Sequence, residues 1–117
     1  MDQMKAIIEI AHAGRVFDAA LADLAAGGNA DYVLSFESAH TLFSDITPVR
    51  LDLLNALARL GPCRVEALAQ AIRRSESSVQ SDSRRLVELG LIERGDDGRL
   101  QVPFETLEIH MTLASAA

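Results

Sequence analysis

Polar side chains able to hydrogen-bond an external ligand gather between Ser75 and Gly90, in the segment SESSVQSDSRRLVELG. Val79, Leu86 and Leu89 recur there at helical spacing, on or near one face. The opposite face carries short hydrogen-bonding side chains followed by guanidinium groups, namely Ser77, Ser78, Gln80, Ser81, Arg84 and Arg85. Such groups match the donors and acceptors of DNA base edges and the charge of phosphates.

The ends of this segment also predict a helix. Ser75 can accept a bond from a free backbone N–H of the first turn, and Gly90 can end the helix in the left-handed conformation. A polar face is equally typical of an ordinary solvated surface helix. The flanking segments favour a recognition helix, the helix that a DNA-binding protein lays in the major groove.

Two shorter helical patterns precede it. Thr47 and Pro48 are suited to begin a helix, which continues to Leu60 and stops at Gly61-Pro62. A second pattern covers Glu66 to Ile72, and Arg73-Arg74 form the turn that follows. Short helices joined by a tight turn, the last one polar outside, are typical of a helix-turn-helix.

A hairpin is predicted directly after the recognition helix, over residues 91–102. Two short extended runs flank the turn Gly95-Asp96-Asp97-Gly98. A hairpin in this position is a wing. Arg94 and Arg99 flank its tip, where they would meet phosphates or a minor groove.

Further elements surround this core. Extended patterns cover residues 5–11, 31–36 and 107–113, and helical patterns cover residues 14–26 and a short stretch after Ser38. Because a minimal winged helix has no place for these strands, we expect them in a separate small sheet. The predicted fold class is α+β, a winged helix-turn-helix with an N-terminal strand-helix and a C-terminal strand. The expected domains are 1–30, an extension for dimerisation or partner binding, and 31–117.

Composition is that of a folded domain with one basic segment. The 117 residues are 49% hydrophobic and carry a net charge of −6. Nine of the eleven basic residues lie in residues 50–99, whose net charge is +1. That asymmetry suits one nucleic-acid face on an acidic body. A single cysteine, no signal peptide and no apolar run of membrane-spanning length indicate a cytoplasmic protein.

The sequence gives little support for a metal site, a redox site or an enzyme active site. His12, His40 and His110 have no Cys or His partner at metal-ligand spacing. Cys63, next to Arg64, is a candidate redox sensor, but core packing is the commoner role of a lone cysteine beside an apolar element. Asp96 and Asp97 suit a turn. With no phosphate loop or nucleophile motif, the sequence predicts no enzyme, no metal and no cofactor.

The order of these pieces resembles a known family. The residues that carry the resemblance are Phe36-Glu37-Ser38, residues 46–54, residues 66–69, Asp82, residues 86–94 and Asp97-Gly98. They are similar to the MarR-like winged helix-turn-helix family of predicted archaeal and bacterial transcriptional regulators, which has some antitoxin-like members. The resemblance covers roughly residues 34–113 and implies a winged helix, a dimer and DNA binding. Arg50 matches the family pattern.

We therefore expect a sequence-specific regulator of transcription that binds double-stranded DNA, most simply as a dimeric repressor. The rival hypothesis is an antitoxin that masks a cognate toxin, or a protein-binding adaptor. Serines at positions 77 and 81, where relatives tend to carry lysine or arginine, favour the rival, as does the acidic net charge. The clustered arginines and the wing favour the regulator.

Roles follow for individual residues. Gln80 suits adenine, and Arg84 suits guanine or phosphate. Asp82 is predicted to pair with a nearby arginine and orient it. The remaining predicted DNA contacts are Arg50, Arg74, Ser77, Ser78, Ser81, Arg85, Arg94 and Arg99. For the dimer interface we expect the apolar face of the last strand and the face of the first helix that holds Phe17, Leu21 and Leu24. Such a dimer would set two recognition helices one turn of DNA apart.

Overall fold

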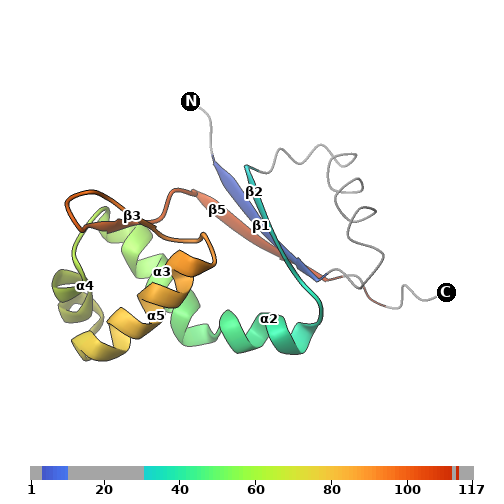
Figure 1. Cartoon of the computed structure of the whole chain (residues 1–117), viewed down its shortest axis with the longest axis horizontal. Coiled ribbons are helices and arrows are strands. Elements are labelled where there is room, and N and C mark those ends of the chain that lie inside the picture. The colour runs from blue at the N-terminus through green and yellow to red at the C-terminus, as the bar shows by residue number, and fades with distance from the viewer. Residues whose placement is uncertain (1–3, 11–30, 112, 114–117) are drawn as a thin grey trace. The chain divides into compact units, whose positions relative to one another are not determined.

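The computed structural model describes residues 4–10, 31–111 and 113 (Figure 1). They form an α+β fold, as predicted. The chain divides into two compact units, Met1–Asp45 with Thr106–Ala117, and Ile46–Glu105. The sequence suggested a boundary after residue 30 instead. The difference arises because the C-terminal strand pairs with the N-terminal one. The predicted helix over residues 14–26 lies outside the described residues, and so does His12.

The first unit contains a three-stranded sheet in the order β2-β1-β5. Both β2 (Tyr32–Phe36) and β5 (Thr106–His110) run parallel to the central strand β1 (Lys5–Ile10). Central parallel strands are covered on both faces, and β1 is accordingly buried over residues 6–9. The prediction that these three strands form a sheet outside the hairpin is confirmed. The last strand ends at His110, however, so its predicted extension to Leu113 is wrong.

A short helix, α2 (Ala39–Asp45), follows β2 in the same unit. Ser38 caps it as predicted, since its hydroxyl accepts a hydrogen bond from the N–H of Thr41 at 3.2 Å. Leu42 is fully buried on its inner side.

The second unit contains three helices and a hairpin. Its helices are α3 (Pro48–Leu60), α4 (Val65–Ile72) and α5 (Glu76–Glu88), and each contacts the other two. The Thr47 hydroxyl caps α3 by accepting from the N–H of Arg50, and Gly61 ends it at a φ of 84°. Buried leucines join the helices, among them Leu53, Leu57, Leu68 and Leu86. The three helices predicted from local signals are confirmed in order and extent.

The predicted hairpin forms, but its strands are short. Strands β3 (Glu93–Arg94) and β4 (Leu100–Gln101) pair antiparallel. Cys63, in the link between α3 and α4, adds a bridge to Leu100. Leu91 and Ile92 were predicted to be extended, yet their N–H groups bond to the carbonyl of Leu86 and complete the end of α5. Their side chains are buried, so this segment serves the core rather than the hairpin.

Candidate nucleic-acid interface

Helix α5 presents one polar face and one buried face. Val79, Ser83 and Leu86 are buried on the inner side. Ser75 caps the helix by accepting from the N–H of Ser78 at 3.2 Å, as predicted. Gly90 ends the turn after the helix at a φ of 84°, the left-handed conformation predicted for it. The exposed face carries Ser77, Gln80, Ser81, Arg84 and Glu88.

Asp82 binds two arginines and so ties α5 to its neighbours. The Arg50 Nε of α3 donates to one carboxylate oxygen at 2.9 Å, and the Arg74 Nη2 of the preceding turn donates to the other at 2.6 Å. The exposed fraction of the side chain is 18% for Arg50, 26% for Arg74 and 16% for Asp82. Water therefore screens the two ion pairs only in part. The predicted pairing of Asp82 with a nearby arginine is confirmed, and it involves two.

The charge of this cluster follows from its contacts. Burial by itself would raise the pKa of Asp82, but hydrogen bonds and positive charges from Arg50 and Arg74 outweigh burial and hold that pKa below its ordinary value. The carboxylate is therefore ionised at neutral pH, and the cluster has a net charge of +1. The two ion pairs join α5 to α3 and to the preceding turn, and Asp82 neutralises one of the two arginine charges.

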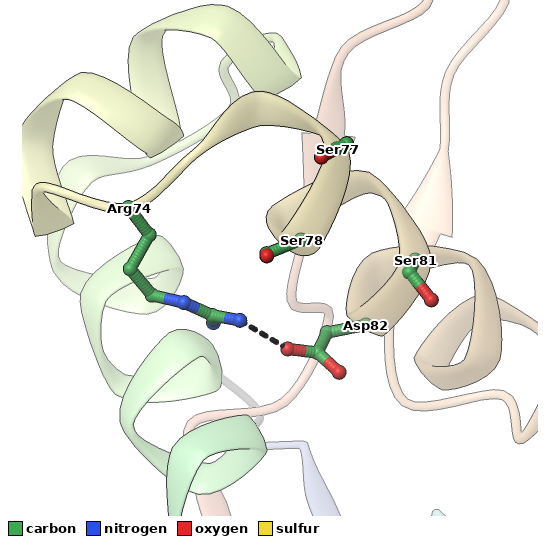
Figure 2. A pocket seen from close by; sticks show the side chains of 5 residues that line it. All are labelled: Arg74, Ser77, Ser78, Ser81 and Asp82. Atoms are coloured by element: carbon green, nitrogen blue, oxygen red, sulfur yellow. Dashed lines mark hydrogen bonds and ion pairs between the residues drawn. The ribbon is translucent and has the colours of Figure 1, made fainter.

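A small open hollow lies beside the cluster, at the start of α5. Figure 2 shows the Arg74 guanidinium directed at Asp82, with three serines of α5 around the same space. The hollow measures about 330 Å³, and its lining consists of Arg74, Ser77, Ser78, Ser81 and Asp82. Its wall thus offers three hydroxyl groups with one cation and one anion, a polar surface of mixed charge.

The predicted site residues of α5 differ in whether their side chains already have partners within the protein. The side chains of Gln80 and Arg84 are exposed, and no other described residue binds them. Arg85 instead pairs with Glu88 at 3.2 Å, one turn further along. Gln80 and Arg84, like the exposed Ser81, can therefore meet a ligand without first breaking a side-chain contact with another described residue.

The hairpin tip contains one functional candidate that sequence reasoning missed. The Arg64 Nη2, from the link before α4, donates to the carbonyl of Asp97 at 2.6 Å. Arg99 lies near the same residue, with its Nε 3.6 Å from an Asp97 carboxylate oxygen. The side chain of Arg94 is exposed, and no described residue binds that side chain. No local signal marks Arg64, because its partner lies 33 residues away and is reached only through the pairing of Cys63 with Leu100.

Cys63 has the chemistry of a packed residue. Partial burial raises the pKa of its thiol, and the charge of Arg99 offsets that only in part. The thiol is therefore protonated at neutral pH and is a weak nucleophile. Within the described ranges, no cluster of His, Cys, Asp and Glu could hold a metal ion. Nor does any helix in the described part of the chain have the length and apolarity to cross a membrane.

Comparison with known proteins identifies the family. The sequence profile of the family described as HVO_A0114 matches residues 45–109. The chain belongs to the HVO_A0114 family. The match covers more than half of the chain, including all of α3, α4, α5 and the hairpin. No curated protein and no solved structure matches the chain significantly.

Proposed function

We propose that this member of the HVO_A0114 family is a MarR-like winged helix-turn-helix protein that binds double-stranded DNA sequence-specifically and represses transcription as a homodimer. In this proposal α4 and α5 are the helix-turn-helix, with α5 in the major groove. The hairpin of β3 and β4 is the wing.

One observation carries the proposal. The exposed face of α5 holds Gln80 and Arg84 without any described partner, on a helix whose other side is anchored to α3 through Asp82. Base readout needs donors and acceptors that are free to bind and are held at a fixed angle. Gln80 then suits adenine, and Arg84 suits guanine or a phosphate. Ser77 and Ser81 supply short hydroxyl contacts to the DNA backbone.

The wing supplies backbone contacts in this scheme. Arg94 and Arg99 are exposed on the hairpin, and Arg64 reaches its tip from the link before α4. Phosphate contacts are independent of sequence and set the register of the protein on the duplex. Arg50 and Arg74, also predicted to contact DNA, act mainly by holding Asp82 and thereby α5.

The charge distribution favours a second candidate function, protein binding as an antitoxin or adaptor. Of the predicted arginine contacts, Arg50 and Arg74 bind Asp82, and Arg85 pairs with Glu88. These acidic partners neutralise part of the field that would attract phosphates. A partner protein with a polar, hydrogen-bonding surface could use the same face of α5.

Binding to fragments of the gene's own upstream region tests the proposal. Fluorescence anisotropy at low salt should give one fragment that binds more tightly than a shuffled fragment of equal length. Arg84→Ala should weaken that binding about tenfold or more, since a good base or phosphate contact contributes about 1–3 kcal/mol. Arg59→Ala, which removes an exposed arginine of α3 outside the predicted site, should leave it unchanged. If the wild type binds no fragment but captures the product of a neighbouring gene, protein binding is the function.

A further inference from the structure

The outer edge of β5 is a candidate surface for strand pairing. β5 is an edge strand of the sheet, and no described strand pairs with its outer side. The Thr106 N–H donates to the Met4 carbonyl on the β1 side. Since backbone groups alternate along a strand, those of Leu107, Ile109 and Met111 point outward. An exposed edge of this kind is a template for another strand.

The side chains along this edge are also exposed. Ile109 is 37% exposed, and Met111, the residue directly after the strand, is 50% exposed, so two large apolar side chains lie exposed at this edge. Glu108 and His110 alternate with them on the other face. The edge therefore offers an apolar row on one face and a polar row on the other.

Within one chain, Glu108 of the polar row already has two partners. Glu108 accepts from the Lys5 Nζ at 2.9 Å and lies 2.9 Å from the Nε2 of His110. Hydrogen bonds from Lys5 and then from His110 hold the pKa of Glu108 below its ordinary value, so the carboxylate is ionised at neutral pH. His110 keeps a ring N–H in either of its charge states, so it can donate to a carboxylate.

We propose that β5 pairs antiparallel with β5 of a second copy of this chain, about a two-fold axis at Ile109, to form a continuous six-stranded sheet. This register sets Glu108 opposite His110 of the second copy, and His110 opposite its Glu108. On the other face Ile109 meets its own counterpart, and Leu107 meets Met111. The pairing extends β5 by one residue to Met111, and it deepens the homodimer of the proposed function without involving DNA.

Charge selects this register over its neighbours. In an antiparallel pair, directly opposite residues lie on the same face of the sheet. A two-fold axis through the sheet therefore passes at a residue position and not between two residues, since neighbouring residues lie on opposite faces. An axis at Glu108 would place the Glu108 carboxylates of the two copies directly opposite each other, where they repel. An axis at His110 would place the two imidazole rings directly opposite each other. An axis at Leu107 pairs Glu108 with Thr106 and leaves His110 unpaired. The axis at Ile109 sets Glu108 of each copy opposite His110 of the other, and it also forms the apolar pairs Ile109–Ile109 and Leu107–Met111.

The other edge of the sheet is a weaker candidate. β2 (Tyr32–Phe36) contains no charged residue, so nothing in its sequence distinguishes one register from another. Val33 is its one large hydrophobic side chain above a third exposed in the described structure. The exposed apolar surface and the complementary polar groups are therefore both on β5.

Mixed cross-linking tests the register directly. In a Cys63→Ala background, Glu108→Cys and His110→Cys proteins are prepared separately and oxidised alone or as an equimolar mixture, without DNA. The mixture should give a disulfide-linked dimer several times faster than either protein alone, because only the mixture sets the two thiols opposite each other. Equal cross-linking of all three samples, or none, overturns the proposal.

Sedimentation equilibrium provides an independent test with uncrosslinked protein. His110→Glu sets two like-charged pairs across the interface and should raise the dimer Kd about tenfold or more. His40→Glu makes the same charge change on exposed α2 and should leave the Kd within about twofold. Mixing His110→Glu with Glu108→Lys protein should restore dimer formation. A wild type that sediments only as a 12.6 kDa species at micromolar concentration refutes the pairing. Because DNA is absent, that result would exclude the homodimer of the proposed function but would not count against DNA binding itself, which the anisotropy experiment tests separately.

Discussion

Removing the Asp82 carboxylate should destabilise the second unit, because it leaves two arginines facing each other without their shared anion. The two ion pairs have N–O distances of 2.9 and 2.6 Å, and all three side chains are less than a third exposed. Exposed pairs contribute about 0.2–1 kcal/mol, whereas removing one partner of a fully buried pair costs about 3–5 kcal/mol. For this intermediate burial we expect Asp82→Ala to lower the free energy of unfolding by about 2–3 kcal/mol.

Urea unfolding at pH 7, followed by circular dichroism, measures this loss. Asp52→Ala, which removes an exposed carboxylate from α3, is the matched control and should change stability by less than about 0.5 kcal/mol. A double-mutant cycle with Arg74→Ala should give a coupling of about 0.5–3 kcal/mol, since the two residues share a hydrogen bond. Equal stability of Asp82→Ala and wild type would refute the role assigned to the cluster.

The pH dependence of the same loss gives a second check. The pKa of Asp82 is lower in the folded protein than its ordinary value. The ionised carboxylate therefore contributes its full stabilisation above the unfolded pKa of about 4, and the contribution is lost as pH falls through the folded pKa. The stability difference between wild type and Asp82→Ala should thus be largest at neutral pH and shrink below about pH 4. A difference that stays constant down to pH 2 would contradict the electrostatic explanation.

Further expectations concern the interface and the hairpin. Gln80→Ala should cost about 1–3 kcal/mol on the operator and little on other DNA, as loss of a base contact does; an equal loss on shuffled DNA would argue against base readout. Arg99→Ala should weaken all sequences alike and reduce the salt slope by about one, measured by anisotropy from 50 to 200 mM salt. Gly98→Ala should cost about 1–2 kcal/mol in thermal unfolding, because its φ is 85° and a Cβ would lie 3.2 Å from the Arg64 Nη1. Cys63 should react with iodoacetamide more slowly at pH 7 than a free cysteine peptide, given its raised pKa; faster reaction would contradict that shift.

Local signals in the sequence determined the helices of the second unit. The start of α3 follows from Thr47 and Pro48, and its end from Gly61. The start of α5 follows from Ser75, and the chain turns away from it at Gly90. These signals work because capping and left-handed backbone conformations depend on residues within one turn of the helix end. The polar face of α5 was equally visible, since helical periodicity assigns side chains to faces.

Only the tertiary structure decided which of these side chains are free. Arg50 and Asp82 are 32 residues apart, and Arg64 and the Asp97 carbonyl are 33 apart, so no local pattern links either pair. The sequence could predict that Asp82 needs a cation, but not that it binds two arginines, nor that Gln80 and Arg84 have no described side-chain partner.

The strand order of the sheet was also decided by the tertiary structure, through pairing between segments far apart in the sequence. Alternation along the chain predicted three strands, because period-two patterning reports that one face is buried. It carries no information on neighbours or direction. That β1 is central, and that β5 joins it in parallel from about a hundred residues away, is decided by packing and hydrogen bonding between segments that are remote in sequence. Among the described strands, β5 has an unpaired outer edge because it joins β1 on the side opposite β2.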